Sequence, residues 1–336
     1  TLVLKQDGIG AVKGGVICAG FVYVFMSIII KVFGVEKVKS FFPPIITGPI
    51  IMVIGLRMSP VALSMSGYSD GKFEVKSLII ALSVLITMIV VSILGRSFFK
   101  LVPILISVIV GYLVSMCFGI IDFTPIHAAN WIGFSKEALS DLTAVPVFRL
   151  SSVIAIAPIA FVVFIEHIGD ITTNGAVVGK DFFKNPGIHR TMLGDGLATI
   201  AAGLIGGPAN TTYGENTGVL AVTKVYDPSI LRIAACYSIF LSIMGKFGAV
   251  LQTVPQPVMG GVSIILFGMI ASIGVRTLID ANLDFSHSRN LILSSLILVL
   301  GISIDNIVIW NTVSVSGLAV SALFGVILNK LLPSDI

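Results

Sequence analysis

Long apolar stretches separated by short polar segments recur along the whole chain. Most measure about 17 to 25 residues, the length that an α-helix needs to cross a hydrocarbon layer roughly 30 Å thick. The runs at 75–99 and 290–304 are nearly continuous in apolar character, whereas the strands of a membrane β-barrel alternate apolar and polar residues. The pattern therefore predicts an all-α membrane protein. We expect crossings at 8–33, 43–63, 75–99, 102–119, 152–171, 191–206, 209–226, 229–253, 257–275, 289–304 and 312–331.

Composition supports this class, because 56% of the residues are hydrophobic and only 11% are charged. A water-soluble domain cannot hide that balance in one core. The net charge of +4 does not indicate a nucleic-acid partner, since Lys and Arg form no large cluster. Cys18, Cys117 and Cys236 lie inside apolar runs, where a thiol more often packs than binds a metal or forms a disulfide.

The distribution of basic residues predicts how the chain is oriented. Loops on one side of the predicted crossings carry most of the Lys and Arg residues, and such loops are cytoplasmic as a rule. The C-terminus then lies inside, and the segment 120–150 forms an outward-facing loop with Trp131 and Phe148 at the interface. The chain starts without Met on a short polar lead, so we expect a truncated N-terminus.

An internal repeat relates the two halves of the chain. Pro44, Gly48 and Gly55 recur with the same spacing 213 residues later, and Gly111 matches Gly325 within a residue of that offset. The later copies are Pro257, Gly261 and Gly268. An odd number of crossings, about seven, separates the two copies, so the second copy is predicted to run inverted through the membrane. Inverted repeats are typical of secondary transporters. The same register indicates that about three segments precede residue 1.

Two acids are predicted on one face of the crossing at 152–171. Glu166 follows a long apolar run, and Asp170 lies one helical turn later. Acids within a membrane helix cost about 2.5 to 3.5 kcal/mol each, so their presence indicates a function. The alternatives are an ion pair with an unseen base for Glu166 and a solvated helix cap for Asp170. For His167 the pattern favours a packing or hydrogen-bonding role.

A second polar constellation interrupts the chain between Gly206 and Val225. Glycines and Pro208 break the helix, the run Asn210–Tyr213 favours a β-strand, and an apolar helix then resumes. Broken membrane helices usually line a cavity. A helix that begins near Glu215 would place this carboxylate and Asn216 at a half-helix N-terminus; the alternative is a cap that only ends the helix.

Two carboxylates that face one cavity suit a neutral heterocycle with N–H donors, because each accepts a hydrogen bond that water otherwise supplies. An acid in an apolar site also exchanges protons near physiological pH. The constellation therefore predicts proton-coupled binding without a cofactor or a metal. The chain lacks the G-x-S-x-G and H-E-x-x-H motifs, which argues against an enzyme.

The run ENTGVLAVTK, from Glu215 to Lys224, resembles the signature of the nucleobase/ascorbate transporter family, also called the nucleobase:cation symporter-2 family. The signature positions are Asn216, Gly218, Thr223 and Lys224. The stretches IEHIGD, GIHRTMLGDGLAT and NTTYGENTGV are similar to the bacterial uracil permeases of that family.

This resemblance implies fourteen membrane segments in two inverted sevens, a core domain, a gate domain and a broken helix with a short β-strand. The first three segments are then missing from this chain. The implied divisions are 1–40 for the core and 41–119 for the gate of the first repeat, 120–150 for the extracytoplasmic loop, and 151–254 for the core and 255–336 for the gate of the second repeat.

The resemblance also assigns candidate site residues. It implies substrate-binding carboxylates at Glu166 and Glu215, with Tyr213 and Gly214 as neighbouring contacts. Phe267 stands where a Tyr can line the pocket. Asp170 stands where uracil permeases often carry His, so the proton carrier is either Asp170 or Glu166.

The function implied by the resemblance is proton-coupled uptake of a nucleobase, with uracil first, across the bacterial cytoplasmic membrane. An elevator-type movement and a homodimer are expected from the family. The rivals are a purine or xanthine permease of the family and an anion transporter of the same fold. A fixed negative charge at Glu215 argues against the anion transporter, because it would repel the anion.

Overall fold

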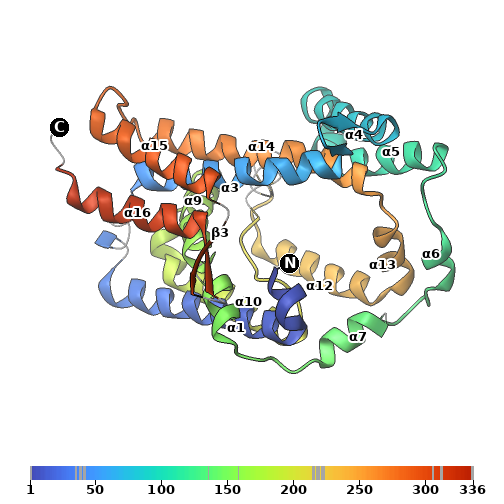
Figure 1. Ribbon diagram of the computed structural model, residues 1–336, viewed down its shortest axis with the longest axis horizontal. Coiled ribbons are helices and arrows are strands. Elements are labelled where there is room, and N and C mark those ends of the chain that lie inside the picture. Colours follow the sequence, from blue (N-terminus) through green and yellow to red (C-terminus); the bar gives the residue numbers. More distant parts are fainter. Residues whose placement is uncertain are drawn as a thin grey trace. The chain divides into compact units, whose positions relative to one another are not determined.

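The computed structural model describes residues 2–34, 36, 37, 40, 43–134, 136–157, 159–213, 216, 220, 224–304, 306–310 and 313–333. Most of these residues are helical (Figure 1). They divide into two compact units. The first comprises Thr1–Ile54, Leu139–Lys224 and Ala271–Ile336, and the second comprises Gly55–Ala138 and Val225–Ile270.

Long helices and one β-hairpin build the first unit. The hairpin pairs β3 with β4 in antiparallel register, and β4 lies beside α8. The elements are α1 (Leu2–Phe33), α8 (Leu150–Ile156), α9 (Ile159–Val178), a π-helical turn (Phe183–Gly187), α10 (Ile188–Ile205), α15 (Ser288–Ser303), β3 (Asn306–Trp310), β4 (Val313–Ser316) and α16 (Gly317–Leu331), with parts of α3 (Pro44–Met65), α7 (Lys136–Thr143) and α14 (Gln256–Asp280).

The second unit holds the remaining parts of α3, α7 and α14 and a group of shorter elements. A two-residue hairpin, β1 (Tyr68–Ser69) with β2 (Lys72–Phe73), connects α3 to α4. The other elements are α4 (Val75–Leu94), a 3₁₀ turn (Ser97–Leu101), α5 (Pro103–Cys117), α6 (Thr124–Ala128), α12 (Pro228–Ile243) and α13 (Gly245–Gln252).

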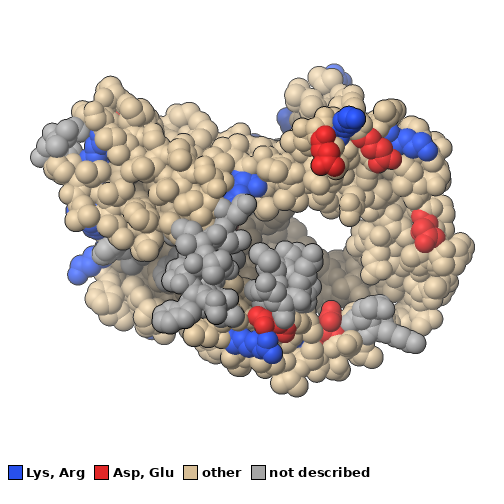
Figure 2. All heavy atoms as spheres, viewed as in Figure 1, with Lys and Arg blue, Asp and Glu red and all other residues tan. Residues whose placement is uncertain are grey.

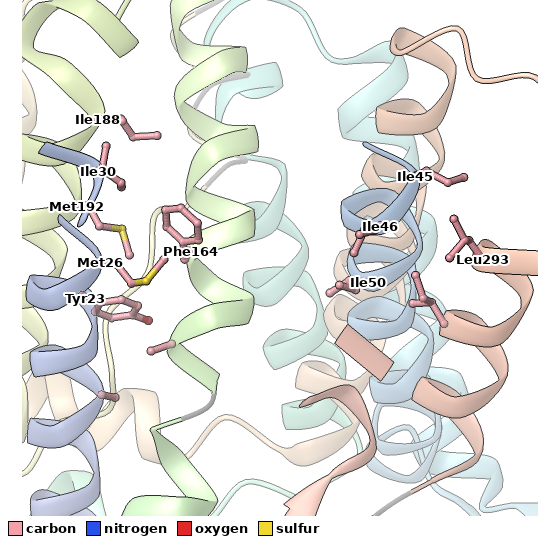
Figure 3. Close-up of a cluster of buried hydrophobic side chains, with 13 residues drawn as sticks. Tyr23, Met26, Ile30, Ile45, Ile46, Ile50, Phe164, Ile188, Met192 and Leu293 are labelled. Atoms are coloured by element: carbon pink, nitrogen blue, oxygen red, sulfur yellow. The ribbon is translucent and has the colours of Figure 1, made fainter. Parts of the chain in front are cut away.

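Small residues allow α1 and α10 to pack backbone to backbone, and the two helices lie side by side in Figure 1. A Cβ atom on Gly20 would lie 2.9 Å from the Gly196 carbonyl oxygen, and one on Gly196 would lie 3.1 Å from the Gly20 carbonyl oxygen. Close approach at glycines is a common way for membrane helices to associate. Above this crossing Tyr23, Met26 and Met192 pack with Phe164 of α9 (Figure 3).

The two units contain buried clusters that correspond at the offset of the sequence repeat. In the second unit Ile80, Val84, Val258 and Val262 form one cluster. In the first unit the core includes Leu293 and Ile297, which stand 213 positions after Ile80 and Val84. That core also includes Ile45 and Ile50, which precede Val258 and Val262 by 213 and 212 positions.

The repeat glycines pack on these clusters in the same way. A Cβ atom on Gly111 of α5 would meet Val84 and Val258, and one on Gly325 of α16 would meet Ile297 and Ile46. Each glycine therefore contacts one residue from its own half of the sequence and one from the other half.

Within the described residues, four helices are long and apolar enough to cross a membrane: Asp7–Phe33, Pro44–Met65, Val75–Leu94 and Gln256–Asp280. The pair α12 and α13 passes the same test as one bent span, and shorter apolar helices occur at Pro103–Cys117, Ser288–Ser303 and Val320–Leu331. Figure 2 shows few charged side chains on the face in view. Large apolar side chains such as Ile86 and Ile93 of α4 are exposed instead, as lipid contact requires.

The predicted crossing at 229–253 consists of two helices, α12 and α13, and not of one continuous helix. The helix breaks at Met244, and its two parts are bent by 85°. The loop after α6 docks at this break: Gly133 donates its N–H to the Ile243 carbonyl at 3.0 Å, and Lys246 donates to the Ile126 carbonyl at 2.5 Å. The Gly133 N–H thus satisfies a carbonyl at the end of α12 that has no partner within the helix.

The strand predicted for Asn210–Tyr213 is also not formed. The described residues 207–213 are non-helical, as expected, but they pair with no strand in the described part of the chain. The β3–β4 hairpin at 306–316 lies instead across the start of the last predicted crossing, so that helix begins at Gly317.

Candidate functional site

Helix α9 carries three titratable side chains within its length, Glu166, His167 and Asp170. Glu166 and Asp170 lie one turn apart on this continuous helix, as the sequence predicts, and both side chains are partly buried. His167 is only 2% exposed. The helix has no Asp or Glu in its first turn and no Lys or Arg in its last.

His167 makes polar contacts with two elements. Its Nε2 atom lies 2.8 Å from the Thr191 hydroxyl of α10. Its Nδ1 atom lies 2.9 Å from a carboxylate oxygen of Asp195, also on α10, and 3.1 Å from the Thr212 hydroxyl. Thr212 donates to the same Asp195 oxygen at 3.4 Å. The imidazole therefore joins α9, α10 and the segment that follows α10.

The segment 207–213 begins where α10 ends at Gly206, which has the left-handed φ of 90° that favours glycine. Pro208 then prevents the helix from continuing. The Asn210 N–H donates to the Thr199 hydroxyl at 3.2 Å, and the Thr211 hydroxyl donates to Glu166 at 3.4 Å. The Thr199 side chain thus accepts one backbone N–H of this non-helical segment, and Glu166 accepts a hydrogen bond from one of its threonine side chains.

Tyr23 of α1 adds a third helix to the group. Its side chain is buried and extends toward α9 beside Phe164 (Figure 3). The phenol interacts electrostatically with both Asp195 and Glu166. Two carboxylates, an imidazole and a phenol thus lie around the start of the broken region, where they offer acceptors and donors to a small polar ligand.

The structure places the other predicted site residues as follows. Tyr213 is the last residue of the continuously described stretch 159–213 and is 50% exposed. Asn216 is exposed and donates its N–H to the Tyr213 carbonyl at 3.2 Å, and Lys224 is exposed with a φ of 55°. Phe267 is half-buried on α14 in the second unit. Gly214, Glu215, Gly218 and Thr223 lie outside the described residues.

The sequence analysis did not single out Asp195, Thr191 or Thr212. A signal for Asp195 was present, since it is an acid between two glycines in the middle of the apolar helix Ile188–Ile205. Thr191 gave no comparable signal, because a hydroxyl in a membrane helix often bonds only its own backbone. Thr191 also does so, donating to the Ile188 carbonyl at 3.0 Å.

Comparison with known proteins gives one family. Residues 4–308 match the sequence model described as Permease family (Xan_ur_permease). The chain is 42% identical to the uracil permease of Bacillus caldolyticus, over 97% of this chain and 76% of that protein. It is 41% identical to the uracil permease of Bacillus subtilis, over 99% and 78%, and 38% identical to that of Escherichia coli K12, over 97% and 75%.

Proposed function

Because this chain belongs to the nucleobase:cation symporter-2 permease family, we propose that it takes up uracil across the bacterial cytoplasmic membrane together with protons. Membership makes the protein a multi-pass membrane permease and not an enzyme. The main support for uracil as the substrate is the similarity to several uracil permeases over nearly the whole chain.

The chemistry of the site supports a nucleobase. Uracil presents two N–H donors and two carbonyl acceptors, and a carboxylate that accepts an N–H in an apolar site contributes about 1.5 to 3 kcal/mol. We assign this role to Glu166 and Glu215, with Tyr213 and Gly214 as further contacts and Phe267 on the gate side. The hydrogen bond from Thr211 to Glu166 supports this, because it ties the first carboxylate to the segment that leads to the second.

Alternating access would follow from movement of a core domain against a gate domain. The division at 1–40, 41–119, 151–254 and 255–336 stays a prediction. The inverted repeat is supported by the corresponding clusters around Val84 and Ile297 and by the equivalent packing of Gly111 and Gly325. We propose Asp170 and Glu166 as proton-exchanging groups and, by resemblance, a homodimeric assembly.

Uptake of radiolabelled uracil into cells that lack their own uracil permease tests the proposal. We expect uptake that a protonophore abolishes, and a loss of at least about tenfold in Glu166→Gln, since one charged hydrogen bond is removed. Glu36→Gln, at an exposed position after α1, is the matched control. Persistence of wild-type uptake in Glu166→Gln or Glu215→Ala would refute the assignment.

Competition separates the rivals within the same assay. Unlabelled uracil in excess should abolish the signal, and xanthine should not. Uptake of labelled xanthine without uptake of labelled uracil would make the protein a purine permease, and uptake of labelled sulfate or bicarbonate instead would favour the anion transporter.

A further inference from the structure

Consecutive residues of α9 hold consecutive residues of the extended segment. Glu166 accepts the hydrogen bond of Thr211, and His167 contacts Thr212. We propose that His167, braced by Asp195, is a positioning residue that sets the segment Asn210–Tyr213 for substrate binding. This inference rests on the proposed function, since the segment leads directly to Tyr213 and Glu215.

The contacts around His167 fit a positioning role. The imidazole is almost wholly buried, and Asp195 receives polar contacts from both His167 and Thr212. A carboxylate next to Nδ1 fixes both the orientation of the ring and the nitrogen that carries the proton. The Thr212 hydroxyl therefore has two partners, the His167 ring nitrogen and the Asp195 carboxylate. These two contacts restrain the backbone at Thr212.

The restraint on Thr212 matters for substrate binding because Thr212 directly precedes Tyr213, a predicted substrate contact. The Cα atoms of consecutive residues are about 3.8 Å apart. A shift at Thr212 would therefore move Tyr213 relative to Glu166, which lies on helix α9. Misplacement of a binding group by about 1 Å is enough to weaken recognition strongly.

The charged and titratable groups near the ring come from three helices. They are Glu166 and Asp170 on α9, Asp195 on α10 and Tyr23 on α1, which interacts with Asp195 and Glu166. Most of these groups are acids, whose carboxylates accept hydrogen bonds. The environment therefore favours a hydrogen-bond donor at the Nδ1 position of the ring. On the other side of the ring, the Thr191 hydroxyl can satisfy Nε2 or the Ile188 carbonyl with its single proton.

Two substitutions distinguish the contribution of the Nδ1 atom of His167 from that of the Nε2 atom. The amide nitrogen of Asn overlaps the Nδ1 position, so His167→Asn keeps the donor to Asp195 and Thr212. The longer His167→Gln instead reaches the Nε2 position beside Thr191. We expect His167→Ala and His167→Gln to raise the KM for uracil at least about tenfold with little change in Vmax per molecule, and His167→Asn to stay within about threefold of wild type.

Thr212→Val tests the same contact from the other partner, and His127→Ala at an exposed position of α6 is the control. Thr212→Val should raise the KM for uracil. The double variant with His167→Ala should have a KM close to that of the single variants, because both substitutions remove the same interaction. A KM within twofold of wild type in both single variants would overturn the proposal, as would rescue by Gln and not by Asn. A purely structural role would lower the amount of folded protein and leave the KM unchanged.

A labelling experiment decides the matter independently of the substrate. In a background with Cys18, Cys117 and Cys236 changed to Ser, Asn210→Cys reports on the extended segment, since residue 210 is exposed. The rate of maleimide modification should change by more than about threefold with His167→Ala or Thr212→Val, because the segment is released, and should be unchanged with His167→Asn. Equal rates in all variants would refute the positioning role. Absence of wild-type uracil uptake would refute only the proposed function.

Discussion

The Lys13 side chain donates a hydrogen bond of 2.7 Å to the main-chain carbonyl of Ala144, 131 residues away in the sequence. The same ammonium group donates to the carbonyls of Asp141 and Leu142 at 2.9 and 3.2 Å, and it is only 1% exposed. Asp141 and Leu142 lie in the last turn of α7, whose final carbonyls have no partner within the helix. A buried lysine thus caps α7 and fixes the segment after it to α1.

Loss of this cap should release the segment that follows α7. Lys13→Met keeps the length of the side chain but leaves three carbonyls without their donor, and each buried unsatisfied group costs about 1 to 3 kcal/mol. We expect a lower melting temperature and faster hydrogen exchange at residues 144–150. Lys72→Met, at an exposed position of β2, should change neither quantity. Unchanged exchange at 144–150 in Lys13→Met would show that the cap does not hold the segment.

A pH dependence is expected at the start of α12. Asp227 caps this helix by accepting the Ser229 N–H at 2.8 Å. This backbone hydrogen bond is the main reason why the pKa of Asp227 lies below its usual value of 3.8. A lowered folded-state pKa stabilises the folded protein above the unfolded-state pKa, and the contribution is lost as the pH falls through the folded-state pKa.

Thermal unfolding of Asp227→Ala across a pH series checks this effect. The variant should melt below the wild type at neutral pH, and the difference should shrink as the pH falls below about 4. Asp227→Asn, which keeps a capping oxygen without the charge, should show a smaller difference at neutral pH, which also shrinks as the pH falls. A constant difference between Asp227→Ala and wild type at all pH values would contradict the assignment.

Much of the helical architecture is predictable from the sequence, for a physical reason. A backbone in lipid must satisfy its hydrogen bonds within one segment, so apolar runs such as 43–63 and 257–275 report directly on the helices Pro44–Met65 and Gln256–Asp280. The placement of Glu166 and Asp170 on one helix follows from the same local rule.

The errors arise where distant residues decide the structure. At the break at Met244 the helix contacts the loop around Ile126 and Gly133. The local sequence does not predict this contact, because the loop lies more than a hundred residues earlier in the chain. The run Asn210–Tyr213 favours a strand, but its hydrogen bonds go to side chains of α9 and α10 instead. The sequence marks Asp195 as an acid within an apolar helix, but its partner His167 lies on another helix, so the pairing of the two residues is seen only in the structure.

The crossing of α1 and α10 gives a test of packing with an internal control. Gly20→Ala would place its Cβ atom 2.9 Å from the Gly196 carbonyl oxygen and 2.6 Å from an Ile200 side-chain carbon, so the helices would have to separate. We expect destabilisation of about 1 to 3 kcal/mol in denaturant unfolding. Gly194→Ala, on α10 with open space around it, should be neutral or stabilising by up to about 1 kcal/mol. Equal stability of the two variants would contradict the close packing.

Asp170 allows the proton carrier to be separated from the substrate site. It lies one turn from Glu166 on α9, so a proton held there can influence Glu166 electrostatically without contacting uracil. If Asp170 exchanges the proton, Asp170→Asn removes coupling and keeps binding. We then expect loss of uracil accumulation against a gradient, while exchange of internal labelled uracil for external uracil continues at a rate near wild type. Asp170→His restores a titratable group and should recover accumulation. Full accumulation by Asp170→Asn would instead assign the coupled proton to Glu166, the remaining acid on this face of the helix.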